Sequence, residues 1–317
     1  MKVVSCFTDT AEMAPLVAAG AGELYCAVPA FPSYGLAARL GTRRLLPAVK
    51  RAHELGVKLS LAVNSLYLDF DAPGWRRFGE ELLKLDRAGL DSFIVSSPAF
   101  FALARKAGPF KAAIHLSSVQ PCFNPAAAAF FMRLGASRVI FPVQLTGPET
   151  ALMVRACRRA GAETELFDYR FFGCGYVNGR CKLHRPVFHT FNDMSQAGEL
   201  CRIGGCGGEV SVKTLDADPA GKRELSAITA RVAVRVNSGG PLRLSGAGAF
   251  FDAFAAGAGF LKYGTRSDPS PLKVRKVAAM RQMILLAEEL KGELGPEKAR
   301  AAFVSRMRAW DPARLSL

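Results

Sequence analysis

Length, composition and charge already narrow what this chain can be. It has 317 residues, half of them apolar, so it can bury a large core and does not have the composition of a disordered chain. The first residues, MKVVSCFTDTAEM, lack the apolar core of a secretory signal, and no run of about 18 uncharged apolar residues follows. We therefore expect a cytoplasmic protein whose cysteines stay reduced.

The net charge of +15 is spread along the chain and does not form one block. Residues 262–317 hold twelve Lys or Arg and six Asp or Glu at helical spacing, which is typical of a solvated helix face. Basic surfaces also attract nucleic-acid phosphates, so an RNA partner stays open as an alternative.

Short apolar runs alternate with amphipathic stretches from the first residue onward. We predict strands at 2–7, 23–28, 57–64, 92–97, 112–119, 138–143, 164–169 and 257–264. Helices are predicted between and after them, at 10–19, 43–55, 73–88, 98–107, 124–134, 147–161, 247–256 and 271–292. Eight such units predict a single TIM-like (β/α)8 barrel over residues 1–317. An open doubly wound sheet is the alternative, but no GxGxxG motif follows the first strand.

Residues 170–245 interrupt this alternation with a segment rich in Gly and Cys. Its cysteines have the spacing C-x6-C-x19-C-x4-C and are Cys174, Cys181, Cys201 and Cys206. This wide, uneven spacing favours an iron–sulfur cluster, whereas zinc sites use closer pairs. A structural zinc ion, or cysteines buried simply as small apolar residues, remain alternatives. We predict a cysteine-rich, cluster-binding insertion within the barrel domain.

In a parallel barrel the carboxyl ends of the strands meet at one mouth, where such barrels carry out their chemistry. The insertion starts after the seventh strand and should open onto this mouth. Cys6 and Cys157 are expected in the core, whereas Cys26 or Cys122 could replace one of the four proposed ligands. The strand-end residues are Cys26, Asn64, Ser96, His115, Ser117, Gln144, Asp168, Tyr169 and Lys262.

Several of these side chains suit catalysis or anion binding. His115 is a candidate proton donor, with a hydrogen-bonded core histidine as the alternative. Lys262 and Arg266 follow the eighth strand and suit a carboxylate, to which Arg39 could add a bidentate contact; surface solvation is the alternative. Glu165 and Asp168 are spaced so that they face opposite sides of their strand and do not form an obvious acid–base pair.

The motifs HLSSVQPCFN and ELFDYRFFGCGYVNGRC resemble the collagenase-like peptidase family U32, and the resemblance covers nearly the whole chain. The first motif carries His115, Ser117, Gln120 and Asn124 at positions similar to the family's histidine, serine, glutamine and asparagine. AVNSL, with Asn64, and the segment around Arg39 add to it. Where the family has Lys–Ile–Glu–Gly–Arg, this chain has KYGTR at 262–266, without the Glu. Where it often has Arg–Glu, the chain has Val143 and Gln144.

The resemblance implies a barrel with a [4Fe–4S] cluster on Cys174, Cys181, Cys201 and Cys206. It implies a role in oxygen-independent hydroxylation, with prephenate as the oxygen donor. The short members that this chain resembles act on a ubiquinone precursor and work as heterodimers, so we predict an aromatic or lipid-like substrate. The alternatives are hydroxylation of tRNA or rRNA, a non-catalytic partner subunit, or a peptidase. No HExxH or GxSxG motif supports peptidase chemistry.

Overall fold

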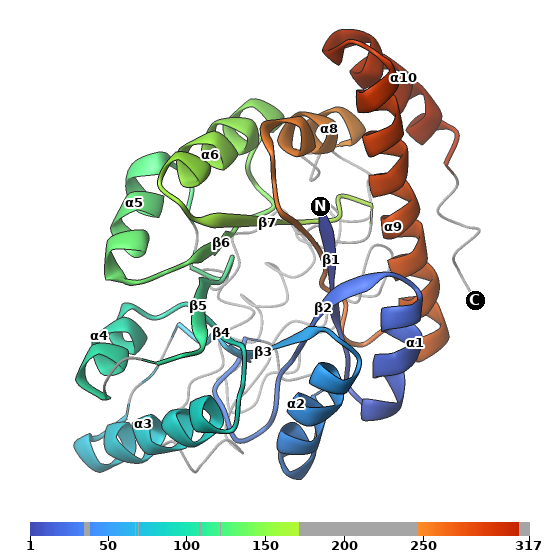
Figure 1. The fold of residues 1–317 in the computed structure, drawn as a ribbon. Coiled ribbons are helices and arrows are strands. Elements are labelled where there is room, and N and C mark those ends of the chain that lie inside the picture. Colours follow the sequence, from blue (N-terminus) through green and yellow to red (C-terminus); the bar gives the residue numbers. More distant parts are fainter. Residues whose placement is uncertain are drawn as a thin grey trace, which may run out of the picture.

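The computed structural model describes residues 1–34, 39–66, 68, 70–107, 110–120, 122–170 and 246–310. Its eight strands are all parallel and close into a barrel in the order β1-β2-β3-β4-β5-β6-β7-β8, so the predicted TIM-like fold is confirmed. Figure 1 looks onto the end of the barrel where the strands begin, with the helices forming an outer ring. The predicted insertion at 170–245 lies, apart from Arg170, outside the described residues.

Each predicted strand is present; β2 has the predicted length but begins two residues earlier, and the other seven are shorter than predicted. The strands are β1 (Lys2–Cys6), β2 (Ala21–Cys26), β3 (Lys58–Val63), β4 (Ser92–Val95), β5 (Ala113–Leu116), β6 (Arg138–Ile140), β7 (Glu163–Phe167) and β8 (Phe260–Tyr263).

The predicted helices are present as well. They are η1 (Thr10–Glu12) with α1 (Met13–Ala18), η2 (Thr42–Arg44) with α2 (Leu45–Glu54), α3 (Ala72–Arg87), α4 (Pro98–Ala107), α5 (Pro125–Leu134), α6 (Gly147–Arg159), α8 (Ala247–Ala256) and α9 (Ser270–Glu293).

One further helix, α10 (Pro296–Arg308), was not predicted. It begins after Gly295 with a proline in its first turn, which is a common helix start. Phe303 is fully buried, and its ring centroid lies 5.5 Å from that of Phe250 and 5.3 Å from that of Phe251 on α8. The helix therefore belongs to the outer layer of the barrel, beside α8 and α9.

Local sequence signals set the ends of several helices. Asp71 and Asn124 cap the first turns of α3 and α5 by accepting backbone N–H bonds. Gly257 ends α8 with a φ of +97°, and the guanidinium of Arg158 packs so closely that a Cβ there would lie 1.9 Å from its Nη1 atom. These signals fix where each chain segment turns back toward the barrel.

Candidate active site at the barrel mouth

A network of charged side chains fills the barrel interior below the mouth. Arg138 on β6 bonds Glu23 on β2, with Nη1–Oε2 at 2.8 Å, and the same Nη1 lies 3.0 Å from Oε2 of Glu165 on β7. Its Nε atom bonds Glu163 at 2.9 Å. Because β2 and β6 are not neighbours in the barrel, the contact between Arg138 and Glu23 crosses the interior.

Lys262 on β8 extends this network toward the mouth. Its Nζ lies 2.7 Å from Oε1 of Glu165 and 3.7 Å from the ring centroid of Tyr25. Burial by itself raises the pKa of Glu165, but Lys262 and Arg138 together lower it to about 2, so this carboxylate stays ionised at neutral pH. The charge of Lys262 is therefore compensated by a buried carboxylate.

His115 also faces the interior, because it pairs in register with Arg138 and neighbouring residues share a face. It is the third residue of β5, and thus lies one layer below the strand end at which we predicted it. Burial and, next, Arg138 lower the pKa of its imidazole to about 3. The ring is therefore neutral at physiological pH, and its Nδ1 has no hydrogen-bond partner in the described part of the chain.

The rim above His115 is held by Asn64 and Ser117. The Asn64 amide donates to Ser117 Oγ at 3.0 Å, and its Oδ1 accepts the backbone N–H of Tyr34 at 2.9 Å. Ser117 Oγ also accepts the Val119 N–H at 3.3 Å, and the Gln120 N–H bonds the Ser117 carbonyl at 3.1 Å. Three predicted residues, Asn64, Ser117 and Gln120, thus lie together after β3 and β5.

Two serines beside this rim are buried, and their hydroxyls lack partners among the described residues. Ser96 lies two residues beyond Ile94, which is in register with His115. Ser33 lies in the loop after β2. Its two neighbours in the chain hold this loop against the residues after β3: the Tyr34 N–H donates to Asn64 Oδ1, and the Pro32 carbonyl accepts the Ser65 N–H. The unpartnered atoms Ser33 Oγ, Ser96 Oγ and His115 Nδ1 therefore gather at and just under the rim, and we call them the open polar set.

The other residues predicted for the site, Arg266, Arg39 and Asn124, lie at different distances from this rim along the chain and make different contacts. Arg266 Nη2 donates to the carbonyl of Tyr34 at 2.7 Å, which ties it to the same loop that contacts Asn64. Arg39 is partly buried next to Leu40, whose N–H bonds the Ala27 carbonyl after β2. Asn124 is exposed, and its Oδ1 accepts the Ala127 N–H at 2.9 Å as the cap of α5. The structure thus brings Arg266 to the rim and assigns Asn124 a structural contact.

The four cysteines proposed as cluster ligands, Cys174, Cys181, Cys201 and Cys206, lie outside the described residues. The chain leaves β7 through Asp168 and Arg170, a buried ion pair at 2.6 Å in which the guanidinium stacks over Trp310. It re-enters the described part of the chain at Gly246, the cap of α8. Both ends of the cysteine segment therefore lie on the mouth side of the barrel.

The four described cysteines are buried free thiols. Cys6 and Cys157 lie in the core as predicted, and burial raises the pKa of each to about 11. Burial raises the pKa of Cys26 and of Cys122 to about 12. Within the described residues no three His, Cys, Asp or Glu side chains lie close enough to hold a metal ion.

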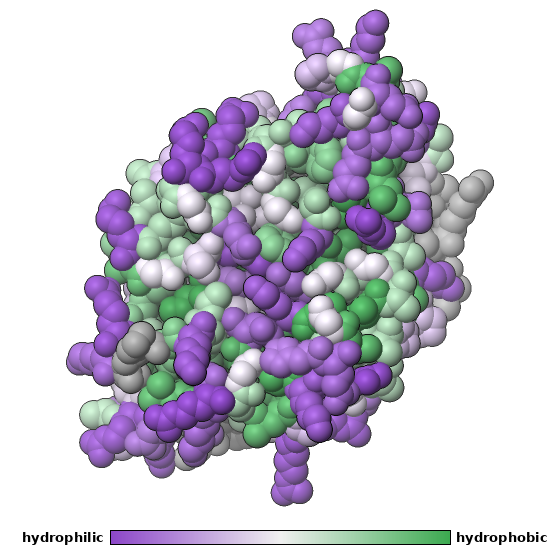
Figure 2. All heavy atoms as spheres, in the orientation of Figure 1, coloured by the Kyte–Doolittle hydropathy of each residue, from purple (hydrophilic) through white to green (hydrophobic). Residues whose placement is uncertain are grey.

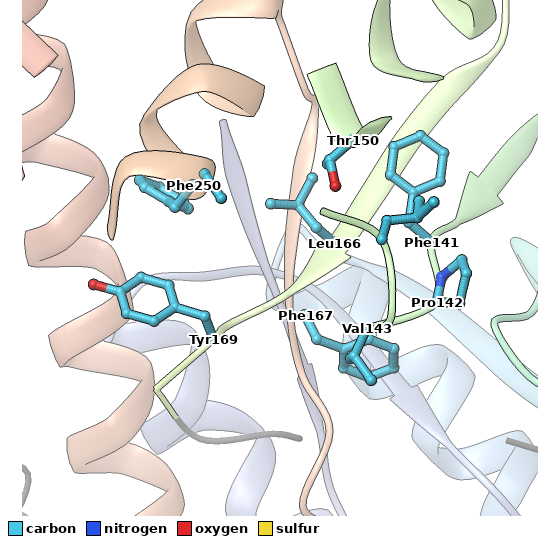
Figure 3. A pocket seen from close by; sticks show the side chains of 10 residues that line it. Phe141, Pro142, Val143, Thr150, Leu166, Phe167, Tyr169 and Phe250 are labelled. Atoms are coloured by element: carbon cyan, nitrogen blue, oxygen red, sulfur yellow. The ribbon is translucent and has the colours of Figure 1, made fainter. Parts of the chain in front are cut away.

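A narrow pocket of about 40 Å³, partly open to solvent, lies beside the mouth at the ends of β6 and β7. Figure 3 shows its aromatic and aliphatic walls, which come from both strands and from the first turns of α6 and α8. Thr150 and Tyr169 are its lining residues with polar side chains, and the Thr150 hydroxyl donates to the Thr146 carbonyl. Its lining residues are Phe141, Pro142, Val143, Leu145, Thr150, Leu166, Phe167, Tyr169, Ala249 and Phe250.

The charged network was missed at the sequence level. Glu23 and Tyr25, and likewise Glu163 and Glu165, are two residues apart on short strands, which places each pair on one face. Arg138 opens a strand as well. Charged residues repeated at this spacing in otherwise apolar strands are the signal that points to a polar barrel interior.

Comparison with known proteins assigns the family. The model of peptidase family U32 matches residues 8–199. The chain belongs to peptidase family U32. In a curated relative, the tRNA hydroxylation protein P2 of Bacillus subtilis (strain 168), 30% of residues are identical over 138 residues, which is 44% of this chain and 43% of the relative. The match thus spans less than half of that relative's length.

The similarity to solved structures is weak. The U32 peptidase Mk0906 is 15% identical, with a TM-score of 0.45 over 53% of this chain and 68% of that one. A structure described as native KDPGal is 8% identical, with a TM-score of 0.46 over 91% of this chain and 97% of that one. No described helix is both long and apolar enough to cross a membrane.

Proposed function

We propose that this U32 protein takes part in the hydroxylation of a nucleobase in RNA, with tRNA as the favoured substrate. The observation that carries the proposal is the open polar set, because buried polar atoms without partners are rare and call for an explanation such as a ligand. A base edge offers neutral donors and acceptors that such atoms can bind. The match to a tRNA hydroxylation protein supports the same substrate class.

This proposal replaces the ubiquinone precursor as the first choice. The match to a tRNA hydroxylation protein favours RNA over a quinone precursor. Lys262, expected to bind the carboxylate of the oxygen donor, is already 2.7 Å from the Glu165 carboxylate, which leaves that role to the arginines near the mouth. His115, held neutral by burial, would accept or donate one hydrogen bond to the substrate ring. Asn64 and Ser117 would hold the rim in place, and Arg266 would remain beside it for an anionic co-substrate.

We further propose that Cys174, Cys181, Cys201 and Cys206 hold a [4Fe–4S] cluster above this mouth. Cys174 follows Arg170, which lies at the mouth end of β7, by four residues in the sequence. When bound, such a cluster supplies one-electron transfer. The protonated thiols of Cys26 and Cys122 are not part of the proposed ligand set.

Hydroxylation replaces a C–H bond of the substrate by C–OH and removes two electrons from it. Without O₂ the balance requires a hydroxylated donor, R–OH, that loses its hydroxyl and leaves as R–H. We propose a hydroxylated carboxylic acid such as prephenate as this donor. Arg266 and Arg39 are the candidate partners for its carboxylates.

A second candidate function is hydroxylation of a hydrophobic aromatic such as a quinone precursor, by this chain alone or in a heterodimer. The aromatic-lined pocket beside the mouth favours it, because apolar ring surfaces gain from burial against such walls.

Deleting the gene in its native host separates the two functions. Under anaerobic growth we expect mass spectrometry of tRNA nucleosides to lose one species 16 mass units heavier than its parent, and quinone content to stay unchanged. Loss of quinone with an unchanged nucleoside profile would reverse the choice.

Iron content tests the cluster separately. Anaerobically isolated protein should contain about four iron and four sulfide per chain. Single substitution of Cys174, Cys181, Cys201 or Cys206 by Ala should remove most of both, because each thiolate holds one iron. The matched variants Cys6→Ala and Cys157→Ala should keep them. Equal iron in all six variants, or one zinc per chain in place of iron, would refute this ligand set.

A further inference from the structure

One segment of the chain contains Lys and Arg residues but no Asp or Glu. Residues 92–148 contain no Asp or Glu, although at the chain's average of 27 in 317 a stretch of this length would hold about five. The same stretch contains Arg105, Lys106, Lys111, Arg133 and Arg138. Arg138 is bound inside the barrel, and the other four side chains are exposed.

The fold gathers these exposed cations along one rim. Arg105 and Lys106 lie in the last turn of α4, and Arg133 lies in that of α5. Arg159, from outside the stretch 92–148, ends α6 on the same side. Lys111 precedes β5. Helices α4 and α5 are neighbours, joined by Phe101 and Phe131 at 6.0 Å between ring centroids. We call Arg105, Lys106, Lys111, Arg133 and Arg159 the acid-free arc.

Figure 2 looks onto the face of the barrel where the strands begin and the helices end, and it shows hydrophilic side chains projecting over the ends of α4, α5 and α6. In the described part of the chain, no member of the acid-free arc forms an ion pair. The arc is therefore a run of cations without ion-pair partners among the described residues, and the half-exposed Glu163 that begins β7 on the same rim is bound to Arg138.

The helix dipole explains only part of this pattern. A cation in the last turn of a helix is favourable by about 0.3–1 kcal/mol. On α2 and α3, however, cations near the helix ends are matched by acids, as in Arg51 with Glu54 and Lys84 with Glu81. The dipole accounts neither for the missing acids on α4 and α5 nor for Lys111, which lies outside any helix.

We propose that the acid-free arc binds the phosphate backbone of RNA. Uncompensated Arg and Lys side chains gain affinity by releasing the counterions of a polyanion. Phe130, 46% exposed and one turn before Arg133, adds a ring on which an unpaired base can stack. A membrane surface fits less well, because the large exposed apolar side chains on the described elements stand singly on different helices and loops.

The arc and the mouth can contact one RNA. The strands have three to six residues, so at about 3.3 Å per residue the barrel is on the order of 10–20 Å deep. An RNA whose base enters the mouth can therefore extend along α4–α6 to the opposite rim. In this respect the inference rests on the RNA substrate proposed above, but RNA binding is measurable without hydroxylation.

The test compares two triple variants with the same loss of charge. Arg105→Gln, Arg133→Gln and Arg159→Gln neutralise the arc, whereas Lys50→Gln, Lys298→Gln and Arg308→Gln neutralise exposed cations on α2 and α10. Binding of purified bulk tRNA is measured from 50 to 200 mM salt. We expect the arc variant to bind at least tenfold more weakly at 50 mM and its slope of log K against log salt to fall by about two.

The control variant should stay within twofold of the unchanged protein. Equal binding by both variants would overturn the proposal. So would loss of binding to phosphatidylserine vesicles with RNA binding retained, since the arc would then be a membrane surface. Circular dichroism melts verify that both variants fold, and Arg133→Gln alone should still lower the slope by about 0.7. If neutralising the arc weakens RNA binding but gene deletion leaves the tRNA nucleosides unchanged, the proposed hydroxylation of tRNA is refuted and the proposed RNA-binding surface is supported.

Discussion

The two sides of the barrel interior differ in how their polar groups are satisfied. On the side of β2, β6, β7 and β8, charged groups bond one another: Arg138 with Glu23 and Glu165, and Lys262 with Glu165. On the side of β4 and β5, and in the loop after β2, neutral polar atoms of Ser33, Ser96 and His115 have no partner among the described residues. Inside the barrel, the charged groups therefore have ion-pair partners, whereas these neutral polar atoms have no hydrogen-bond partner among the described residues.

Energetics explain why this division is tolerable. A buried charge without a partner costs several kcal/mol, so the interior can hold Arg138 and Lys262 only with their carboxylates. A neutral hydroxyl or imidazole without a partner costs about 1–3 kcal/mol, which a domain of this size can sustain at a few positions. The charged side therefore supports the structure, and the neutral side is where a ligand gains most by binding.

Arg138→Met should have the largest effect, because it leaves Glu23 buried without a cation and Glu165 with Lys262 as its one remaining cation among the described residues. We expect a loss of about 3–5 kcal/mol in the free energy of unfolding, measured by urea denaturation. The matched control, Lys84→Met, breaks an exposed pair with Glu81 and should cost less than about 1 kcal/mol. Similar losses for both would contradict the structural role of the charged side.

The two sides should also begin to lose stability at different pH values on acidification. The folded pKa of Glu165 is lowered from 4.5 to about 2, so its stabilising contribution is complete above pH 4.5 and is lost as the pH falls toward 2. The folded pKa of His115 is lowered from 6.5 to about 3, so the cost of protonation begins earlier, below pH 6.5.

Stability measured against pH tests this separation. Glu165→Gln should flatten the profile between pH 4.5 and 2, whereas His115→Gln should flatten it between pH 6.5 and 3, so of the two groups His115 alone acts between pH 6.5 and 4.5. Profiles parallel to that of the unchanged protein would show that these groups do not titrate as the geometry requires.

Ser96→Ala should have the smallest effect on stability and a clear effect on function. It removes an unpartnered hydroxyl, so unfolding free energy should stay within about 1 kcal/mol or rise. Hydroxylation in the complemented deletion strain should fall severalfold, since the substrate loses a hydrogen bond. Ser137→Ala serves as the control, because its hydroxyl bonds the Ile114 carbonyl on the exposed surface near the other end of the barrel. Equal activity of both variants would remove Ser96 from the site.

The fold could be predicted from sequence because its signals are local. Strand and helix periodicities repeat eight times, and caps such as Asn124 before Pro125 mark helix starts. The site was harder, since the contact between Arg138 and Glu23 joins residues 115 apart in the chain and depends on barrel closure. Asn124, expected in the site, caps α5 through its Oδ1, and Lys262, expected as an anion-binding group, has an internal carboxylate partner that its own motif does not reveal.

Complementation of the deletion strain tests most directly whether the barrel mouth hydroxylates RNA. The strain receives either the unchanged gene or His115→Ala, and both tRNA nucleosides and the iron content of the purified proteins are measured. We predict that the unchanged gene restores the missing hydroxylated nucleoside, and that His115→Ala does not, although it folds and carries the same iron. Full restoration by His115→Ala would contradict the account, because the interior of the mouth would then take no part in the reaction.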